Sequence, residues 1–246
     1  MGSELSMSQN NNLMACIAFH YSKDNLPYLN KVVDVFINEY DVPAKVIIDT
    51  NTYDIDYMNS KDVEVSVHSN LKHPFHLTWM HRQHMKDNLD KYDNFMYLEH
   101  DMYVPFVNYL NYLDNFKILF PACIPSFVRI EELNGEKYIV DVTNKQSFIS
   151  YHIEDKKFVN LDKPYHAFWI MPGKELKETI LSNFVRVDTL REAAAYYPML
   201  DLQKMSMVEV DEKSISEKCY SYHLTNNYVG LKNTPFAMII VNELFL

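Results

Sequence analysis

The sequence predicts an α/β protein with a Rossmann-like architecture, in which helices flank a mixed, mostly parallel central sheet. Through residue 113, short apolar runs of strand length alternate with segments of helical periodicity, and the connections between them are short. That alternation is typical of βαβ units, whose strands run parallel. Beyond residue 113, hairpin patterns mix with helical ones, so we expect antiparallel strands there.

The first half of the chain is expected to supply the parallel strands. Each is a short apolar or alternating run that ends in polar residues, and these runs are 13–21, 44–51, 63–70 and 94–104. Helical spacing of apolar residues predicts a helix after the first strand, with Pro27 in its first turn. Two further helices are expected at 74–89 and 106–113.

The second half is expected to begin with a β-hairpin, because Asn134 and Gly135 separate two runs rich in strand-forming residues. The predicted elements of this half are the hairpin strands 117–132 and 137–143, a strand at 165–173, a helix at 174–184 and a helix that starts near Leu190. No repeat or long linker divides the chain. We therefore expect a disordered lead or tag at 1–12 and a single domain at 13–246.

Composition argues against several functional classes. Only four glycines occur, and neither GxGxxG nor GxxxxGK[ST] is present, which argues against a nicotinamide dehydrogenase or a P-loop kinase. The formal net charge is −10 and there is no lysine/arginine block, so nucleic acid is not an expected partner. The three cysteines form no CxxC pair and are expected to be free thiols.

The chain is expected to be soluble and cytoplasmic. Its N-terminus lacks the basic and then apolar order of a signal peptide, and no apolar run approaches the length of a spanning helix. The tail at 235–246 is unusually apolar but too short to span a bilayer. We expect it to form a packed strand, or a dimer or docking contact.

Polar clusters follow the first four predicted strands, at the edge where open α/β sheets bind ligands. The clusters are His20/Tyr21, Asp49/Asn51, His68/Asn70 and Glu99/His100/Asp101. The last is the sharpest, because Glu99 and Asp101 are expected to point to one face of the strand predicted at 94–104, and no lysine or arginine is adjacent. Two such carboxylates repel unless a cation or a proton intervenes. A divalent metal with oxygen ligands would resolve this conflict, whereas a strand end that simply enters solvent is the alternative.

The order of these features resembles glycosyltransferases of the A type. The resemblance covers about residues 13–230: a first strand ending FHYSKDN, a second ending IIDTN, and an acidic triplet after a later apolar strand. The family's hallmark is an Asp-x-Asp motif, of which Glu99-His100-Asp101 would be an E-x-D variant. The resemblance implies a GT-A fold with a nucleotide-binding half at about 13–104 and an acceptor-binding half at about 105–246. It also implies sugar transfer from a nucleoside-diphosphate sugar to a hydroxyl of a glycan, lipid-linked or small-molecule acceptor, and we expect this transfer to be inverting.

The same resemblance assigns roles on the donor side. Phe19, His20 and Tyr21 would lie beside the nucleotide base, and Asp49 would hydrogen-bond the base or ribose, with Asn51 as a further substrate contact. Glu99, which stands where the family motif has aspartate, would contact the ribose. Arg82 would face donor phosphates or sugar. Asp101 would bind Mn²⁺ or Mg²⁺, which bridges the diphosphate oxygens.

Later residues would complete the site. His223 resembles a late histidine that many family members supply as a metal ligand, and a structural histidine is the alternative reading. Glu192, with Asp188 second, would be the base that takes the proton of the acceptor hydroxyl, or a first-turn carboxylate that favours its helix. Arg191 would bind phosphate or pair with an acid. Trp169 would form an acceptor platform or belong to the core.

Two alternative functions follow from other features. A nucleotide- or sugar-binding α/β module without catalysis has the same sequence features. The histidines between 73 and 84 also suggest a metal-dependent hydrolase, because intervals of three can place imidazoles on one helix face. No HExxH motif or accompanying carboxylate completes a zinc-protease pattern in that segment, which makes this alternative the weaker one.

Overall fold

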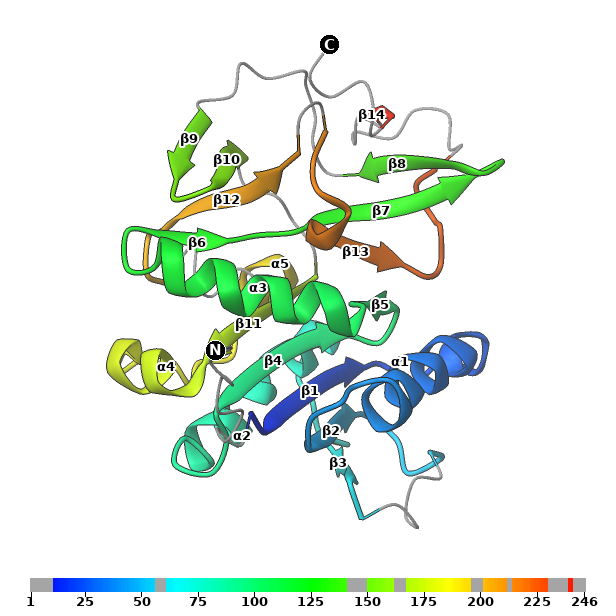
Figure 1. Cartoon of the computed structure of the whole chain (residues 1–246). Coiled ribbons are helices and arrows are strands. Elements are labelled where there is room, and N and C mark those ends of the chain that lie inside the picture. The colour runs from blue at the N-terminus through cyan, green and yellow to red at the C-terminus, as the bar shows by residue number, and fades with distance from the viewer. Residues whose placement is uncertain are drawn as a thin grey trace.

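The structure is a computed structural model, and it describes residues 11–55, 61–140, 150–161, 167–195, 201–211, 214–229 and 239–240. Its central sheet has five strands in the order β11-β4-β1-β2-β3 (Figure 1). The parallel strands are β1 (Leu13–Phe19), β2 (Ala44–Thr50), β3 (Val63–Val67) and β4 (Asn94–Glu99), and β11 (Phe168–Pro172) runs antiparallel to β4. The predicted α/β class, with a mixed, mostly parallel central sheet flanked by helices, is confirmed.

β1 lies in the middle of this sheet because it can be covered on both faces. Its seven residues are apolar and all are buried. A strand of this kind reads as a continuous apolar run rather than an alternating one. β4 is buried along its whole length as well, although it begins with Asn94 and ends with Glu99. The polar end of β4 therefore marks a candidate functional site at the boundary of the core.

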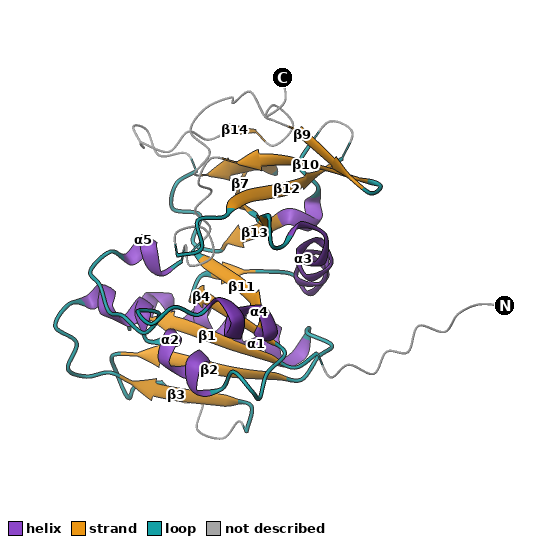
Figure 2. Ribbon diagram, turned by 90° about the vertical axis from the view of Figure 1, so that its left-hand side faces the viewer, coloured by secondary structure: helices purple, strands orange, loops and turns teal. Residues whose placement is uncertain are grey.

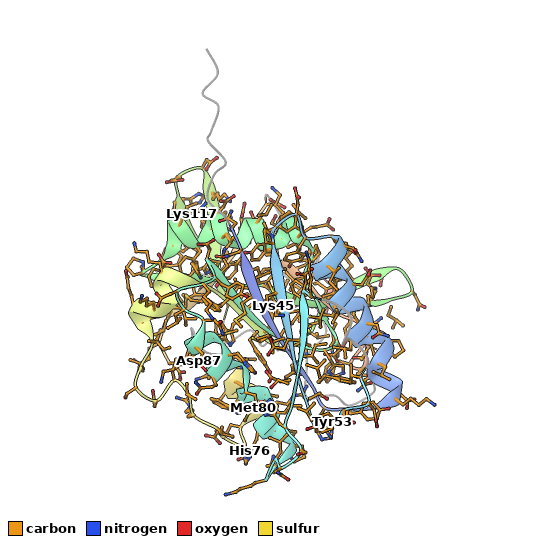
Figure 3. The ribbon with its side chains drawn as sticks, turned by 90° about the horizontal axis from the view of Figure 1, so that it is seen from below. Lys45, Tyr53, His76, Met80, Asp87 and Lys117 are labelled. Atoms are coloured by element: carbon orange, nitrogen blue, oxygen red, sulfur yellow. The ribbon has the colours of Figure 1, made fainter. Side chains whose placement is uncertain are left out.

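Helices lie on both sides of the central sheet, as Figure 3 shows from below. The short 3-10 helix η1 (Lys23–Asn25) leads into α1 (Leu26–Asn38) on one side. On the other side run the 3-10 helix η2 (Pro74–Trp79) and α2 (His81–Asp87), where Figure 3 labels His76, Met80 and Asp87. The single helix predicted at 74–89 is thus two helices that meet at Met80. The aromatic-rich first part has weak α-helical propensity, which favours the tighter 3-10 form.

Two smaller sheets lie above the central sheet in Figure 1, and Figure 2 shows the same layering from the side. One has the order β6-β12-β10-β9 and the other β14-β8-β7-β13-β5. Their strands are β5 (Met102–Tyr103), β6 (Cys123–Pro125), β7 (Val128–Leu133), β8 (Glu136–Val140), β9 (Ser150–Ile153), β10 (Lys156–Leu161), β12 (Met205–Val210), β13 (Tyr220–His223) and β14 (Ile239–Ile240). The sequence patterns indicated hairpins here but not two separate sheets.

The helix α3 (Phe106–Leu119) lies between the central sheet and the smaller ones (Figure 1). Tyr112 and Phe116 pack into the core around the central sheet, whereas Leu119 packs with Phe158 and Met207 of the smaller sheet. The helix was predicted to end at 113, but its apolar residues continue because it has a core on both sides. The remaining helices are α4 (Gly173–Thr179), α5 (Arg191–Ala194) and the 3-10 helix η3 (Glu217–Cys219).

The predicted β-hairpin around Asn134 and Gly135 is confirmed as β7 and β8, which pair antiparallel. Both turn residues have positive φ angles, 54° for Asn134 and 81° for Gly135. This conformation matches the twist of hairpin strands and favours Asn-Gly. The first strand of the predicted hairpin is shorter than expected, because the range from 117 also holds the end of α3 and β6.

Several expectations fall largely outside the described residues. The lead predicted at 1–12 is described only at residues 11 and 12. Of the apolar tail at 235–246, only Ile239–Ile240 is described, and it forms β14 against β8. The dimer or docking contact predicted for this tail therefore stays a prediction.

Candidate active site

The candidate site lies where the parallel strands of the central sheet end. The chain leaves β1 through α1 toward β2 and β3, and later enters β4 on the other side of β1. Such a reversal of strand order is where open α/β sheets bind ligands. Ala18 of β1 is opposite Asp49 of β2 and opposite Glu99 of β4, so these residues share one row and one face of the sheet. Two buried carboxylates thus flank the reversal point with a small side chain between them.

Asp101 and His223 meet just beyond the end of β4. The His223 Nε2 lies 3.1 Å from the Asp101 Oδ2, although the residues are 122 positions apart in the chain. β5 pairs with β13 so that Met102 is opposite His223, and the Leu224 amide donates to the Asp101 carbonyl at 2.8 Å. Both side chains are buried, with Asp101 8% and His223 6% exposed. Backbone pairing therefore brings together the two residues that the family resemblance names as metal ligands.

Glu131 of β7 holds the other side of the His223 ring. Its Oε1 lies 2.5 Å from the His223 Nδ1, and its Oε2 accepts from the Tyr228 and Val229 amides at 2.9 and 2.6 Å. An ionised carboxylate can only accept, so Nδ1 must carry a proton. The Nε2 atom is thereby directed toward Asp101. This carboxylate–histidine arrangement is the one that supports metal-ligating histidines in proteins.

Opposing effects set the charges in this triad. Burial would raise the pKa of the Asp101 carboxyl, but the hydrogen bond with His223 and the neighbouring positive charges hold that pKa well below its usual range. Burial would likewise raise the pKa of Glu131, whereas its hydrogen bonds to His223 and to two amides lower it. Burial would lower the pKa of His223, and its two carboxylate partners raise it. In the metal-free triad the contacts thus favour the ionised form of both carboxylates and the protonated form of the His223 ring.

These residues fit the divalent metal that the sequence resemblance implies. Asp101 is ionised and buried, and Nε2 would become a free ligand atom on loss of one proton, while Glu131 keeps the other proton in place. The Thr225 Oγ1 lies 2.9 Å from Nε2 and 3.4 Å from the Asp101 Oδ2. One carboxylate and one imidazole suit Mn²⁺, and Mg²⁺ commonly takes one or two carboxylates together with substrate phosphates. Asp101 and His223 would hold such an ion.

Glu99 differs from the arrangement expected from strand alternation. β4 ends at Glu99, and residues 100 and 101 form a turn, so Asp101 no longer follows the strand's alternation. Arg191, at the start of α5, pairs with the Glu99 carboxylate through both Nε and one terminal nitrogen. A cation of the chain therefore balances Glu99. Of the two roles predicted for Arg191, the structure contains the ion pair.

Asp49 has two histidine partners that come from other elements. Its Oδ1 lies 2.8 Å from the His68 Nε2 and 3.0 Å from the His84 Nε2. Asp49 is only 1% exposed, whereas the histidine side chains are 24% and 23% exposed. The hydrogen bond to Asp49 raises the pKa of His84 despite its partial burial. The nucleotide contact predicted for Asp49 stays a prediction.

The remaining donor-side candidates lie along the ends of β1 and β2. The Asn51 Oδ1 accepts from the Tyr21 amide at 2.7 Å, which ties the loop after β1 to the end of β2. Phe19 is buried and its ring centroid lies 5.2 Å from that of His100, in an edge-on arrangement. His20 is exposed. The base contacts predicted for these residues stay predictions.

Arg82 and Trp169 are both fully buried side chains. The Arg82 Nη1 donates to the Asp201 carboxylate at 2.9 Å and to the Phe184 carbonyl at 3.2 Å, and its guanidinium lies over the Trp79 ring. The Trp169 Nε1 donates to the Ala194 carbonyl at 3.1 Å. Trp169 is part of the core, and the two side chains hold Phe184, Ala194 and Asp201 by hydrogen bonds. Their predicted substrate contacts stay predictions.

The two base candidates flank the start of α5. Glu192 is exposed in the first turn of this helix. The Asp188 Oδ1 accepts from the Thr189 and Leu190 amides at 2.6 and 3.2 Å, so it caps the chain ahead of the helix. Because Arg191 is bound to Glu99, Glu192 lies one residue from a side chain anchored at the end of β4. That placement is compatible with either role predicted for Glu192.

Sequence reasoning missed Glu131 and the pairing of His68 and His84 with Asp49. Glu131 follows an apolar residue in a strand that also contains Arg129 and Glu132, so its charge gave no distinctive signal in the sequence. The sequence pattern places His68 at a strand end and His84 in a set of histidines at helical spacing, and neither pattern indicates Asp49 as a partner. In the structure His81 stacks on Tyr97 with centroids 4.0 Å apart, while His84 turns to Asp49.

No helix in the described part of the chain combines the length and apolarity needed to cross a membrane. No protein-family model matches the chain, and no curated protein does.

Among solved structures, the chain is similar to residues 1–349 of S. aureus TarS, with 10% identity and a TM-score of 0.48, over 87% of this chain and 60% of that one. It is also similar to the bifunctional IspDF from Campylobacter jejuni, with 12% identity and a TM-score of 0.35, over 77% of this chain and 47% of that one. A third is mannose-1-phosphate geranyltransferase from Thermus thermophilus, with 8% identity and a TM-score of 0.42, over 81% of this chain and 73% of that one. The chain thus spans less than two thirds of the first two. At these identities the similarity is one of chain arrangement.

Proposed function

We propose that the protein is a metal-dependent glycosyltransferase, which moves a sugar from a nucleoside-diphosphate sugar to an acceptor hydroxyl with inversion. The observation that carries this proposal is the buried Asp101–His223 pair, supported by Glu131, beside the reversal point of the central sheet. The chain's own residues supply a carboxylate and a directed imidazole there. The resemblance of the first strands and of the Glu99-His100-Asp101 triplet to A-type glycosyltransferases supports the same function.

On the donor side, the ends of β1 and β2 would hold the nucleotide. Asn51 fixes the backbone at Tyr21, so the ring of Tyr21 and the neighbouring His20 are presented from a defined loop. Asp101 and His223 would hold Mn²⁺ or Mg²⁺ close to this loop. That ion, when bound, supplies Lewis-acid stabilisation of the nucleoside-diphosphate leaving group.

On the acceptor side, Glu192 is the proposed base. The acceptor oxygen attacks the anomeric carbon, the bond from that carbon to the diphosphate oxygen breaks, and the hydroxyl proton passes to Glu192. The nucleoside diphosphate departs with the electron pair of the broken bond. The Arg191–Glu99 pair would position Glu192 by fixing the start of α5 against β4. General-base assistance of this kind contributes about 10²–10⁴-fold to a rate.

A donor screen tests the proposal. The full chain is incubated with UDP-, GDP- and dTDP-sugars, with Mn²⁺ or Mg²⁺ and then with EDTA, and released phosphates are identified. Release of nucleoside diphosphate that requires metal supports the proposal. Formation of pyrophosphate from nucleoside triphosphate and sugar phosphate would instead identify a nucleotidyltransferase. Binding of a nucleotide sugar without any turnover, across acceptors of the three classes, would identify a binding module.

A further inference from the structure

Asp49, His68 and His84 form a second group of metal-ligating side chains, apart from Asp101 and His223. One ligand atom from each of these three residues lies within 4.8 Å of the other two. We propose that this cluster is a binding site for a divalent transition-metal ion, with Zn²⁺ as the expected ion. The site would bind the metal independently of the proposed transferase activity.

The three side chains converge from separate elements. Asp49 lies near the end of β2, His68 directly follows β3, and His84 lies on α2. The backbone fixes the first two, because β2 and β3 pair with Asp49 opposite Ser66 and the His68 amide donates to the Thr50 carbonyl at 2.7 Å. The η2–α2 segment packs on the sheet face toward which Asp49 points, on the side marked by His76, Met80 and Asp87 in Figure 3. Folding alone thus assembles the donor set.

The charge of Asp49 favours a cation at this position. In the described part of the chain, the hydrogen-bond partners of its carboxylate are the His68 and His84 rings, and no lysine or arginine contacts it. The residue is 1% exposed. A buried carboxylate needs a compensating charge, which two neutral imidazoles do not provide. Either a protonated histidine or a bound metal can provide it.

The geometry suits a tetrahedral metal with mixed nitrogen and oxygen ligands. Zinc bonds of about 2.0–2.1 Å place tetrahedral ligand atoms about 3.3 Å apart. The two Nε2 atoms already lie 2.8 and 3.0 Å from one Asp49 oxygen. Small side-chain rotations would widen these distances to the spacing of ligands around zinc. Two imidazoles favour zinc over magnesium or calcium, which prefer all-oxygen sites. The partial exposure of both histidines leaves a route for the ion and room for a water as fourth ligand.

Metal binding here would give Asp49 a role different from the nucleotide contact expected from the sequence. It would also tie together β2, β3 and α2, which border the proposed donor pocket. An ion selective for the folded state stabilises that state by mass action. The site is therefore expected to be visible in thermal unfolding as well as in direct binding.

The test is a Zn²⁺ titration of the full chain after removal of metals with a chelator and dialysis. Calorimetry measures affinity and stoichiometry, and Co²⁺ absorption reports tetrahedral coordination. His84→Gln keeps an amide donor for Asp49 but removes the ligating imidazole, and His68→Ala is the second variant. His152→Ala, an exposed histidine on β9, is the matched control. Asp101→Asn alters the other candidate metal site, so it shows whether a bound ion occupies that site or the cluster of Asp49, His68 and His84.

We expect Asp101→Asn and His152→Ala to retain a tight Zn²⁺ site that raises the melting temperature. His84→Gln and His68→Ala should lose at least about tenfold to a hundredfold in affinity, since removing even a supporting group from a metal site has that effect. The proposal is overturned if the metal-free wild type binds no Zn²⁺, or if both histidine variants bind as tightly as the control. It is also overturned if Asp101→Asn abolishes all binding. None of these outcomes depends on turnover, so the glycosyltransferase proposal stands or falls separately.

Discussion

Substitution of Glu131 is the most specific test of the candidate metal centre, because Glu131 contacts His223 and would not itself ligate a metal. In Glu131→Gln, an amide NH₂ replaces one carboxylate oxygen. If that NH₂ faced the Tyr228 and Val229 amides, two buried donors would lose their acceptor, at about 1–3 kcal/mol each. If the NH₂ group faces the His223 ring instead, only the contact of the carboxylate oxygen with the His223 Nδ1 is lost. The NH₂ group is therefore expected to face His223.

That orientation changes the tautomer of the histidine. The His223 Nδ1 must then accept from the glutamine, so Nε2 keeps its proton and offers no lone pair to a metal ion beside Asp101. We expect Mn²⁺ affinity to fall by about 10–100-fold, the usual effect of losing a group that orients a metal ligand. The melting temperature should fall by about 3–12 °C, since one hydrogen bond to a charged group contributes about 1.5–3 kcal/mol and 1 kcal/mol corresponds to about 2–4 °C in a chain of this size.

The assay follows free Mn²⁺ by its electron paramagnetic resonance signal during titration of the metal-free protein. Glu132→Gln is the control, because Glu132 is the exposed neighbour on the same strand. It removes the same charge from β7 without contact to the His223 ring. Equal Mn²⁺ affinity for Glu131→Gln, Glu132→Gln and wild type would refute the orienting role of Glu131.

Three further outcomes are expected. Glu192→Gln should lower kcat by about 10²–10⁴-fold with Mn²⁺ and donor affinities near wild type, and an unchanged kcat would exclude it as the base. Asn51→Ala removes the acceptor of the Tyr21 amide and should raise the donor KM more than it lowers kcat; steady-state kinetics at fixed acceptor measures this split. Burial would raise the pKa of Glu209, but hydrogen bonds from Asn115 and Lys156 lower it. Ionised Glu209 thus stabilises the fold above its unfolded pKa of about 4.5, and this stabilisation is lost as the pH falls through the lower folded pKa. Denaturant unfolding at several pH values should show Glu209→Gln less stable than wild type at pH 7, with the difference vanishing in acid.

The sequence was sufficient to predict what depends on local pattern. Continuous apolar runs predict β1 and β4, which are buried along their whole length, and alternation predicts β3. Asn134 with Gly135 predicts the hairpin because these residues readily adopt positive φ. Asp101 and His223 were named as metal ligands through a family resemblance rather than through spacing, and the structure places their side chains in contact. Strand alternation failed at Asp101, because the backbone turns directly after Glu99.

Contacts between segments that are distant in the sequence could not be predicted from local sequence pattern. The His73–His84 segment was judged to lack a carboxylate, and the partner of His84 is Asp49, 35 residues earlier on another strand. Arg191 pairs with Glu99 across 92 residues, and Glu131 reaches His223 across the same separation. Such pairs depend on which strands and helices become neighbours in the folded chain, and hydrophobic periodicity does not specify that choice.

The most direct measurement is the Mn²⁺ dependence of nucleoside-diphosphate release by wild type and Asp101→Asn, at saturating donor and acceptor. Asparagine keeps the size of the side chain and a hydrogen-bonding contact for His223, so melting curves should show both proteins folded. We expect the wild type to be inactive after chelation and fully restored by Mn²⁺, and Asp101→Asn to stay inactive at every Mn²⁺ concentration. Turnover by Asp101→Asn at the wild-type rate, or turnover by the chelated wild type, would contradict a metal-dependent transfer at this site.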